Sequence, residues 1–337
     1  MKSSTIITII FAMALLVGLA IPKAHALELL GYWDFNNPGD ATSAADVTGN
    51  SPDLSFNGAA SYTGDGEGLS DSAGDYALDL GGVNDGSNGQ TSEGDHLSSA
   101  YENNAMSVVF WQNTTQTGNT SAFWINSPNS NGTQRGFQAH TPWSNGTIYF
   151  DQSGCCAGSQ RLTVGGLVQL DTWQHFVFQR DADGNMEIWV DGVQAASQGG
   201  AEPLDEFNGI ITVGSDLNSG NSFAGRIDDF GIFNEKLDED QIATLAGGAS
   251  PMALIDTSDD DEDGLPDIWE EKLVDNLDDL NGNAAGPGPG SGTGDFDGDG
   301  LTDLDEYEET KTNPIVADTD KDGLLDGVET NTGTYVS

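Results

Sequence analysis

Between about residues 27 and 248, short runs of alternating apolar and polar residues are separated by clusters of Gly, Asn, Asp and Ser. A period of two places successive side chains on opposite faces of a strand. The pattern predicts strands at residues 29–35, 76–80, 107–113, 121–126, 136–140, 147–151, 173–180, 186–191, 210–214 and 223–233. Asp183-Gly184, between two of these runs, is a hairpin signal. Many short strands at near-regular spacing favour an all-β, antiparallel sandwich or jelly roll over a parallel sheet.

One helix is predicted ahead of the C-terminal region. Asp238 can cap its N-terminus, Gln241 follows three residues later as in a capping box, and Gly247 can end it. Ile242 and Leu245 give this helix one apolar side.

After about residue 250, three acidic stretches match the D-x-D-x-D-G-x5-E calcium-loop template in register. The template residues are Asp259, Asp261, Asp263, Leu265, Asp267 and Glu270; Asp295, Asp297, Asp299, Leu301, Asp303 and Glu306; and Asp318, Asp320, Asp322, Leu324, Asp326 and Glu329. Ca²⁺ takes about six to eight hard oxygens, which this spacing supplies from carboxylates, the carbonyl at position 7 and a two-oxygen Glu at position 12. A solvated, disordered acidic tail would not repeat Gly-Leu at one offset three times. The sequence therefore predicts a C-terminal tail of Ca²⁺-binding loops.

Charge separates this tail from the rest of the chain. The formal net charge is -45, and residues 256–337 hold 25 Asp and Glu against 3 Lys. Such a field repels nucleic acid and anionic lipid and attracts divalent cations. We therefore do not expect the protein to bind nucleic acid.

The first 26 residues have the pattern of a signal peptide. Lys2 provides a positive start, residues 6–20 form an almost unbroken apolar run, and Ala24-His25-Ala26 is an A-x-A cleavage site. An uncleaved anchor is the alternative. No second apolar run of spanning length follows, so we expect a mature chain that begins at Leu27, has no membrane span, and is secreted or held at the cell surface.

The two cysteines, Cys155 and Cys156, are adjacent. In an exported chain we expect them to form a disulfide with each other, as a strained ring in a tight turn that Gly154 and Gly158 make feasible. Two free thiols are the alternative. We divide the chain into a signal peptide (1–26), a jelly-roll domain (27–250) and calcium-binding repeats (251–337), with a Gly/Pro linker at 281–294.

Four landmarks in order resemble the laminin-G-like, concanavalin A-like jelly-roll family: 173–178 (WQHFVF), 186–192 (MEIWVDG), 225–233 (GRIDDFGIF), and Leu237 followed by Gln241-Ile242. The opening 31–35 (GYWDF) also resembles that family's first strand, so the resemblance covers roughly residues 28–248. The tail, with Thr312-Asn-Pro followed by Asp318-Thr-Asp, resembles bacterial thrombospondin type 3 repeats. The first resemblance implies a structural Ca²⁺ where the first and last strands meet, held by Asp34 and by Asp228 or Asp229. The alternative is that these residues make turn or strand-end hydrogen bonds.

The jelly-roll fold does not by itself choose a function. Aromatic rings among amide side chains are typical of sugar sites, and Trp143, Trp124 and Tyr149 are our candidates for ligand binding. The alternative places these rings in the core. We therefore expect an adhesion or recognition module for a glycan or an extracellular matrix or surface protein.

Two other functions stay open: a structural scaffold without sugar binding, and an accessory fragment of a larger carbohydrate-active enzyme. A fourth loop at the second spacing of 23 residues would begin near position 341, which favours a longer protein. Catalysis by this chain is not expected. The Glu-x-Asp-x-x-Glu pattern of related hydrolases is missing, its nearest approach being Glu187 to Asp191, and no Gly-x-Ser-x-Gly elbow occurs.

Overall fold

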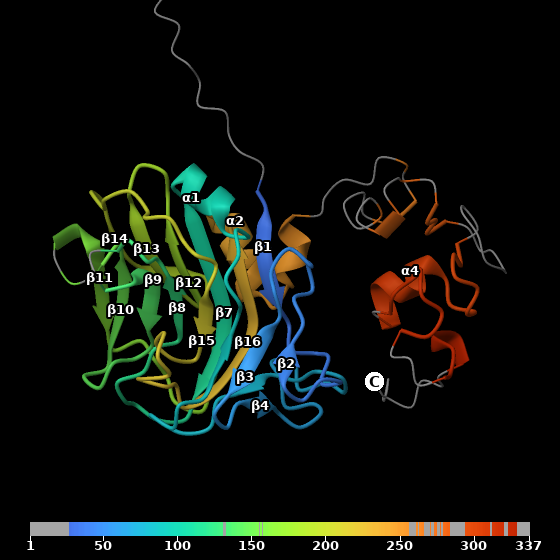
Figure 1. The fold of residues 1–337 in the computed structure, drawn as a ribbon, viewed down its shortest axis with the longest axis horizontal. Helices are drawn as coiled ribbons and strands as arrows, with labels where there is room; N and C mark the ends of the chain where they lie inside the picture. The colour runs from blue at the N-terminus through green and yellow to red at the C-terminus, as the bar shows by residue number, and fades with distance from the viewer. Residues whose placement is uncertain are drawn as a thin grey trace, which may run out of the picture.

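A computed structural model describes residues 27–130, 133–154, 156, 158–255, 261, 263–265, 270, 273–274, 277, 279–283, 294–310, 312–319 and 323–328. Within these residues the fold is a sandwich of two antiparallel, eight-stranded sheets (Figure 1). Helices are few and short, and among the described residues none has the length and apolar character needed to cross a bilayer.

Sheet A runs in the order β14 (Val193–Gln198), β13 (Met186–Val190), β12 (Trp173–Arg180), β7 (Met106–Thr114), β16 (Gly225–Phe233), β5 (Leu78–Asp79), β4 (Ser61–Tyr62), and β1 (Leu29–Trp33) also pairs with β16. Sheet B runs in the order β11 (Arg161–Gly165), β10 (Thr147–Gln152), β9 (Arg135–His140), β8 (Phe123–Asn126), β15 (Ile211–Val213), β6 (Asn88–Gln90), β3 (Leu54–Asn57), β2 (Ser43–Ala44). All strand pairs in both sheets are antiparallel.

The short helical segments are α1 (Ser98–Asn103), η1 (Gly158–Gln160), α2 (Glu239–Ala246), η2 (Pro251–Leu254), α4 (Asp303–Asp305), η3 (Glu306–Thr310) and η4 (Asp326–Val328). The predicted helix is confirmed as α2. The Asp238 side chain accepts from the Gln241 backbone N–H, Gln241 returns the bond, and Gly247 is the C-cap.

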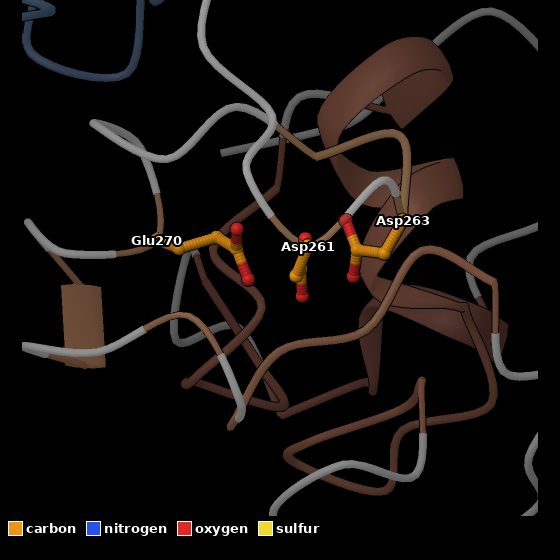
Figure 2. Close-up of side chains that lie close together, drawn as sticks. All are labelled: Asp261, Asp263 and Glu270. Atoms are coloured by element: carbon orange, nitrogen blue, oxygen red, sulfur yellow. The ribbon is translucent and has the colours of Figure 1, made fainter.

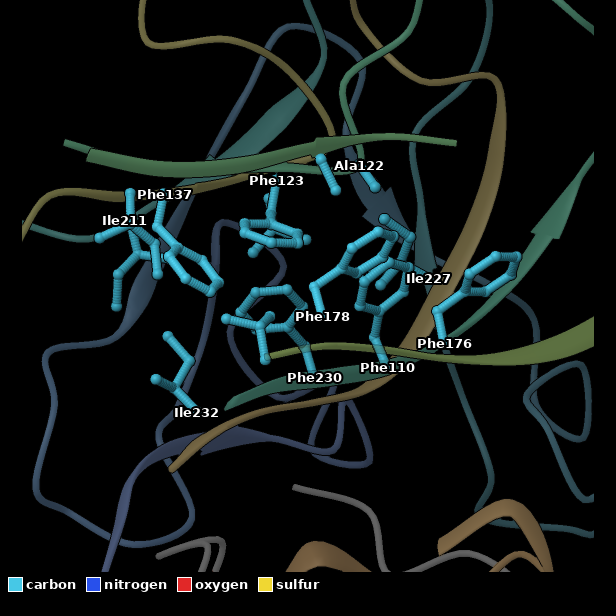
Figure 3. Packing of buried hydrophobic residues seen from close by; sticks show 14 of the residues in the cluster. Phe110, Ala122, Phe123, Phe137, Phe176, Phe178, Ile211, Ile227, Phe230 and Ile232 are labelled. Atoms are coloured by element: carbon cyan, nitrogen blue, oxygen red, sulfur yellow. The ribbon is translucent and has the colours of Figure 1, made fainter. Parts of the chain in front are cut away.

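The main core lies between the two sheets and is rich in phenylalanine (Figure 3). The Phe110 ring lies at its centre, with ring centroids 5.8–6.0 Å from Phe123, Phe176, Phe178 and Phe230. These rings come from both sheets, so their packing holds the layers together.

A second apolar cluster covers the outer face of sheet A. Ile242 and Leu245 of α2 pack there with Val177 of β12 and Trp189 of β13, and Met252 of η2 packs against the cluster. Because α2 and η2 follow β16 directly in sequence, the chain after the last strand folds back over the sheet. Sheet A is therefore packed on both faces.

Each predicted strand is present, with its ends displaced by at most two residues. The first strand stops before Phe35, which has a φ of 56°, and β13 stops before Asp191, with a φ of 50°. Left-handed residues such as these leave the ladder and begin a turn. Asp183-Gly184 lies in the β12–β13 connection, so the hairpin prediction is confirmed as well.

Candidate functional site

Sheet B presents polar and aromatic side chains on the face away from the core. Phe123, Phe137 and Phe150 point inward and are fully buried. Side chains alternate along a strand, so the neighbours of these residues point outward. We call this set the sheet-B face; it consists of Trp124, Gln138, His140, Tyr149, Asp151 and Arg161.

A hydrogen-bonded chain crosses the sheet-B face. The Arg161 guanidinium donates two hydrogen bonds to the Asp151 carboxylate. Nε lies 2.5 Å from Oδ1, and Nη2 lies 2.7 Å from Oδ2. Gln138 Nε2 donates to Asp151 Oδ2 at 2.8 Å and lies 3.1 Å from His140 Nε2. His140 Nδ1 lies 3.0 Å from the Thr120 carbonyl oxygen, which fixes the proton on Nδ1 and leaves Nε2 to accept. The chain spans three neighbouring strands and keeps each group in one orientation.

Aromatic rings flank this chain. Trp143, in the loop between β9 and β10, has its ring centroid 4.4 Å from that of His140 and 6.5 Å from that of Tyr149. The Arg161 guanidinium lies over the Tyr149 ring, 4.7 Å from its centroid. Trp143 and Tyr149 are both half-buried, so part of each side chain stays accessible. The structure thus brings together two of the three predicted ligand-binding rings.

Trp124 is placed differently. Its side chain is only 6 % exposed, its Nε1 donates to the Gln134 carbonyl at 3.1 Å, and the Arg135 guanidinium covers its ring at 4.9 Å. A ligand could reach this ring only if Arg135 moved.

The two buried histidines give the sandwich a pH dependence. Burial lowers the pKa of His140 to about 4 and that of His175 to about 3, against roughly 6.5 for an exposed histidine. As the pH falls from ~6.5 toward ~4, these histidines bind protons in the unfolded chain but stay neutral in the folded protein. The folded state therefore loses stability over this pH range.

We expect His175→Gln to flatten this loss, because each unit of pKa difference is worth about 1.4 kcal/mol. Urea unfolding of parent and variant between pH 7 and pH 4.5 measures it. If the free energy of unfolding fell equally with pH in the two proteins, His175 would not contribute to the loss.

The predicted Ca²⁺ site of the jelly roll lies where β1 pairs with β16. The Tyr32 hydroxyl donates to the Asp229 carboxylate, and Asp228 Oδ2 accepts from the Leu69 backbone N–H at 2.9 Å. Burial and the charge of the adjacent Asp229 raise the pKa of Asp228, and burial raises the pKa of Asp34. Hydrogen bonding, the alternative reading of these residues, is thus present.

Within the part of the chain that the structure describes, Asp34, Asp228 and Asp229 do not form a group whose carboxylate oxygens all lie within 4.8 Å of one another. A Ca²⁺ held by these residues stays a prediction.

In the tail, the carboxylates of the first loop converge. One oxygen each from Asp261, Asp263 and Glu270 lies within 4.8 Å of the others (Figure 2). Asp263 and Glu270 are buried. Leu265, at position 7, donates its backbone N–H to Asp263 Oδ1 at 2.8 Å, which holds that carboxylate in place.

The second loop forms a similar group from Asp295, Asp297 and Asp299. Leu301 repeats the position-7 contact, donating its N–H to Asp299 Oδ1 at 2.7 Å. Burial and the neighbouring Asp299 raise the pKa of Asp297 to about 6. A bound cation would reverse that shift, because it favours the ionised carboxylate.

Two position-9 residues do more than the template indicates. Asp303 accepts from the Phe296 N–H at 2.8 Å and from the Asn281 N–H at 3.0 Å, so it joins the second loop to the segment before it. Asp326 accepts from the Thr319 N–H at 3.0 Å within the third loop. Sequence spacing alone did not indicate these contacts.

The glycines at position 6 have the backbone that the template requires. The φ angles of Gly264, Gly300 and Gly323 are 94°, 103° and 98°, a region that L side chains rarely adopt. In the third loop, Gly323 donates its N–H to Asp318 Oδ2 at 3.0 Å, and the Leu324 side chain is exposed. Five template residues lie outside the described residues: Asp259, Asp267, Asp320, Asp322 and Glu329.

Cys156 lies near the sheet-B face, with its Sγ 3.6 Å from Arg135 Nη1. None of the described cysteines is free. Cys155 lies outside the described residues, so its pairing with Cys156 stays a prediction.

The two acids nearest to a hydrolase pattern have structural partners. Glu187 pairs with Lys236 at 2.6 Å and accepts from Trp189 Nε1 at 2.8 Å. Asp191 accepts from the His175 N–H at 2.9 Å and turns the chain after β13. They stabilise the outer side of sheet A and the turn that follows.

Residues 84–243 match the family model of the concanavalin A-like lectin/glucanases superfamily. The match agrees with the two-sheet antiparallel sandwich that these residues form. The match covers the sandwich from before β6 to within α2 and does not extend to the calcium-loop motifs. No curated protein matches the chain significantly.

Two solved structures are similar to part of the chain at low identity. Domain 4 of AbnA, an extracellular GH43 arabinanase from Geobacillus stearothermophilus solved with arabinotriose, has 19% identity and a TM-score of 0.49, over 66% of this chain and 100% of that one. The receptor-binding domain of a botulinum neurotoxin C/D mosaic has 16% identity and a TM-score of 0.48, over 65% of this chain and 51% of that one. The chain thus spans about half the length of that toxin domain.

Proposed function

We propose that the protein is an exported, calcium-binding recognition module whose sandwich binds a glycan on the sheet-B face. The observation that carries the proposal is the half-exposed pair Trp143 and Tyr149 beside the fixed chain from Arg161 to His140. Rings stack on the CH groups of a sugar, and the partly exposed Arg161 guanidinium can donate to its hydroxyls. Gln138 and Asp151 are fully buried beneath it and hold Arg161 in place. A pre-organised surface also limits the entropy lost on binding.

The other parts of the proposal rest on sequence together with local geometry. Export rests on the signal-peptide pattern of residues 1–26. Calcium binding by thrombospondin type 3-like repeats rests on three template loops and on the convergent carboxylates of the first two. We propose no enzymatic activity for this chain.

We expect Trp143→Ala and Tyr149→Ala each to weaken binding of the best glycan by about 5- to 30-fold, because central aromatic contacts typically carry about 1–2 kcal/mol. A glycan array with and without Ca²⁺ identifies the ligand, and titration of the variants measures the loss. Tyr101→Ala, which changes an exposed ring on α1, is the matched control and should bind as the parent does.

Two outcomes would count against the sugar site. Equal affinity of the parent and both ring variants would place the site elsewhere on the sandwich. No binding to any glycan on the array would favour the alternative, a surface scaffold.

A further inference from the structure

A carboxylate of the third calcium loop lies among those of the second. Oxygens of Asp299, Glu306 and Asp326 all lie within 4.8 Å of one another. In the template, Asp299 and Glu306 are positions 5 and 12 of the second loop, and Asp326 is position 9 of the third. Spacing alone would assign Asp326 to its own loop.

The three side chains are buried together, and the described part of the tail places no positive partner beside them. Glu306 is 0 % exposed, Asp326 3 % and Asp299 6 %. Glu306 Oε1 accepts from Thr312 Oγ1 at 3.1 Å, but its Oε2 is buried and has no hydrogen-bond partner. Among the described residues, no Lys, Arg or His forms an ion pair with any of the three.

Such an arrangement is unfavourable for the protein alone. Burying an ionised carboxylate without a partner costs several kcal/mol, and like charges nearby add to that cost. A divalent cation at this point removes both penalties, because it supplies the missing charge and takes the free oxygen of Glu306 as a ligand. Hard carboxylate oxygens suit Ca²⁺.

Hydrogen bonds to the carboxylates hold the two loops in this position. Gly327, next to Asp326, donates its N–H to Asp299 Oδ2 at 2.9 Å. The Thr319 hydroxyl donates to Asp326 Oδ2 at 2.7 Å, which aims that carboxylate from the third loop. A Cβ added to Gly327 would lie 2.5 Å from the Asp299 carbonyl oxygen, so only glycine permits this approach.

We propose that the second and third loops share one Ca²⁺, held by Asp299, Glu306 and Asp326. The proposal rests on the calcium binding proposed for the tail and assigns one ion to residues of two loops. Asp299 also belongs to the Asp295–Asp297–Asp299 group, so it connects the shared ion to the rest of the second loop. Order in the third loop then depends on the second.

A double-mutant cycle in the full chain tests the sharing. Ca²⁺ titration of Glu306→Gln and Asp326→Asn should show the same site weakened in each, by at least about tenfold. The double variant should lose little more than either single variant, because both changes remove ligands of one ion. Asp318→Asn is the matched control: it removes an acid of the third loop outside the group, and its loss should add to that of Glu306→Gln.

The outcomes separate the two proposals. If the parent protein binds no Ca²⁺, calcium binding by the tail fails, and the shared ion fails with it. If the parent binds Ca²⁺ but Glu306→Gln and Asp326→Asn weaken two different sites additively, only the sharing is overturned. Native mass spectrometry of the same variants counts the ions independently of affinity.

Discussion

Replacing Phe110 with alanine is expected to destabilise the sandwich by about 3–5 kcal/mol. The side chain is fully buried and contacts rings from both sheets, so its removal leaves a cavity that neither layer can fill without moving (Figure 3). Urea unfolding followed by tryptophan fluorescence measures the change. A loss of this size is a large fraction of the stability of a typical domain.

Val193→Ala provides the control for that experiment. Val193 lies in β14 and is 68 % exposed, so its truncation should change stability by less than about 0.5 kcal/mol. Similar losses in the two variants would contradict the assignment of the core to the space between the sheets.

We expect the tail to become disordered when calcium is removed. Its 25 acidic residues repel one another, and few apolar residues are present to offset the loss of chain entropy. Extracellular calcium loops bind with Kd of about 10⁻⁴–10⁻³ M, and at roughly tenfold excess each ion adds about 1.4 kcal/mol. Limited proteolysis with and without a chelator should show cleavage after residue 255 only without Ca²⁺.

Glu306→Gln should reproduce part of this effect while Ca²⁺ is present. Burial and Asp297 raise the pKa of Glu306 to about 8. Glu306 must lose its proton before its carboxylate can bind a cation, and the cation favours that loss. Glu308→Gln, the same change at a position outside the template, is the matched control. Equal calcium affinity in these two variants would show that the loop assignment is wrong.

The sequence predicted the strands that carry the core, because buried runs such as β7 and β12 are long and apolar. It did not predict β2, β3, β4, β6, β11 and β14. β14 (VQAASQ) has no buried residue and lies at one end of sheet A, and β6 (NGQ) contains a glycine, so neither shows an apolar alternation. Pairing with a neighbour, not local pattern, makes these segments strands.

The sheet-B face was predicted only in part. The rings were found because aromatic residues stand out in a sequence. The chain from Arg161 to His140 depends on which strands are neighbours, and this follows from the order of the sheet. A usable signal was nevertheless present. Gln138 and His140, and likewise Tyr149 and Asp151, alternate with apolar core residues on their strands.

The tail shows what motif spacing can and cannot supply. It located the carboxylates and the bends at Gly264, Gly300 and Gly323. It assigned each acid to its own loop, whereas Asp326 lies among residues of the preceding one. A template describes one loop in isolation, and contacts between successive loops are outside it.

The pairing of β1 with β16 also sets a limit on how quickly the sandwich can be completed. The Glu28 N–H donates to the Asn234 side chain, which lies 206 positions later in the sequence. During synthesis, β1 therefore cannot pair until β16 has been made. At a synthesis rate of about 5–20 residues per second, that wait is roughly 10–40 s. During it, an apolar strand has no partner and is exposed to aggregation. A chain of this topology gains from staying unfolded until all of it is present, and we expect refolding from denaturant to be slow compared with that of helical proteins of the same length.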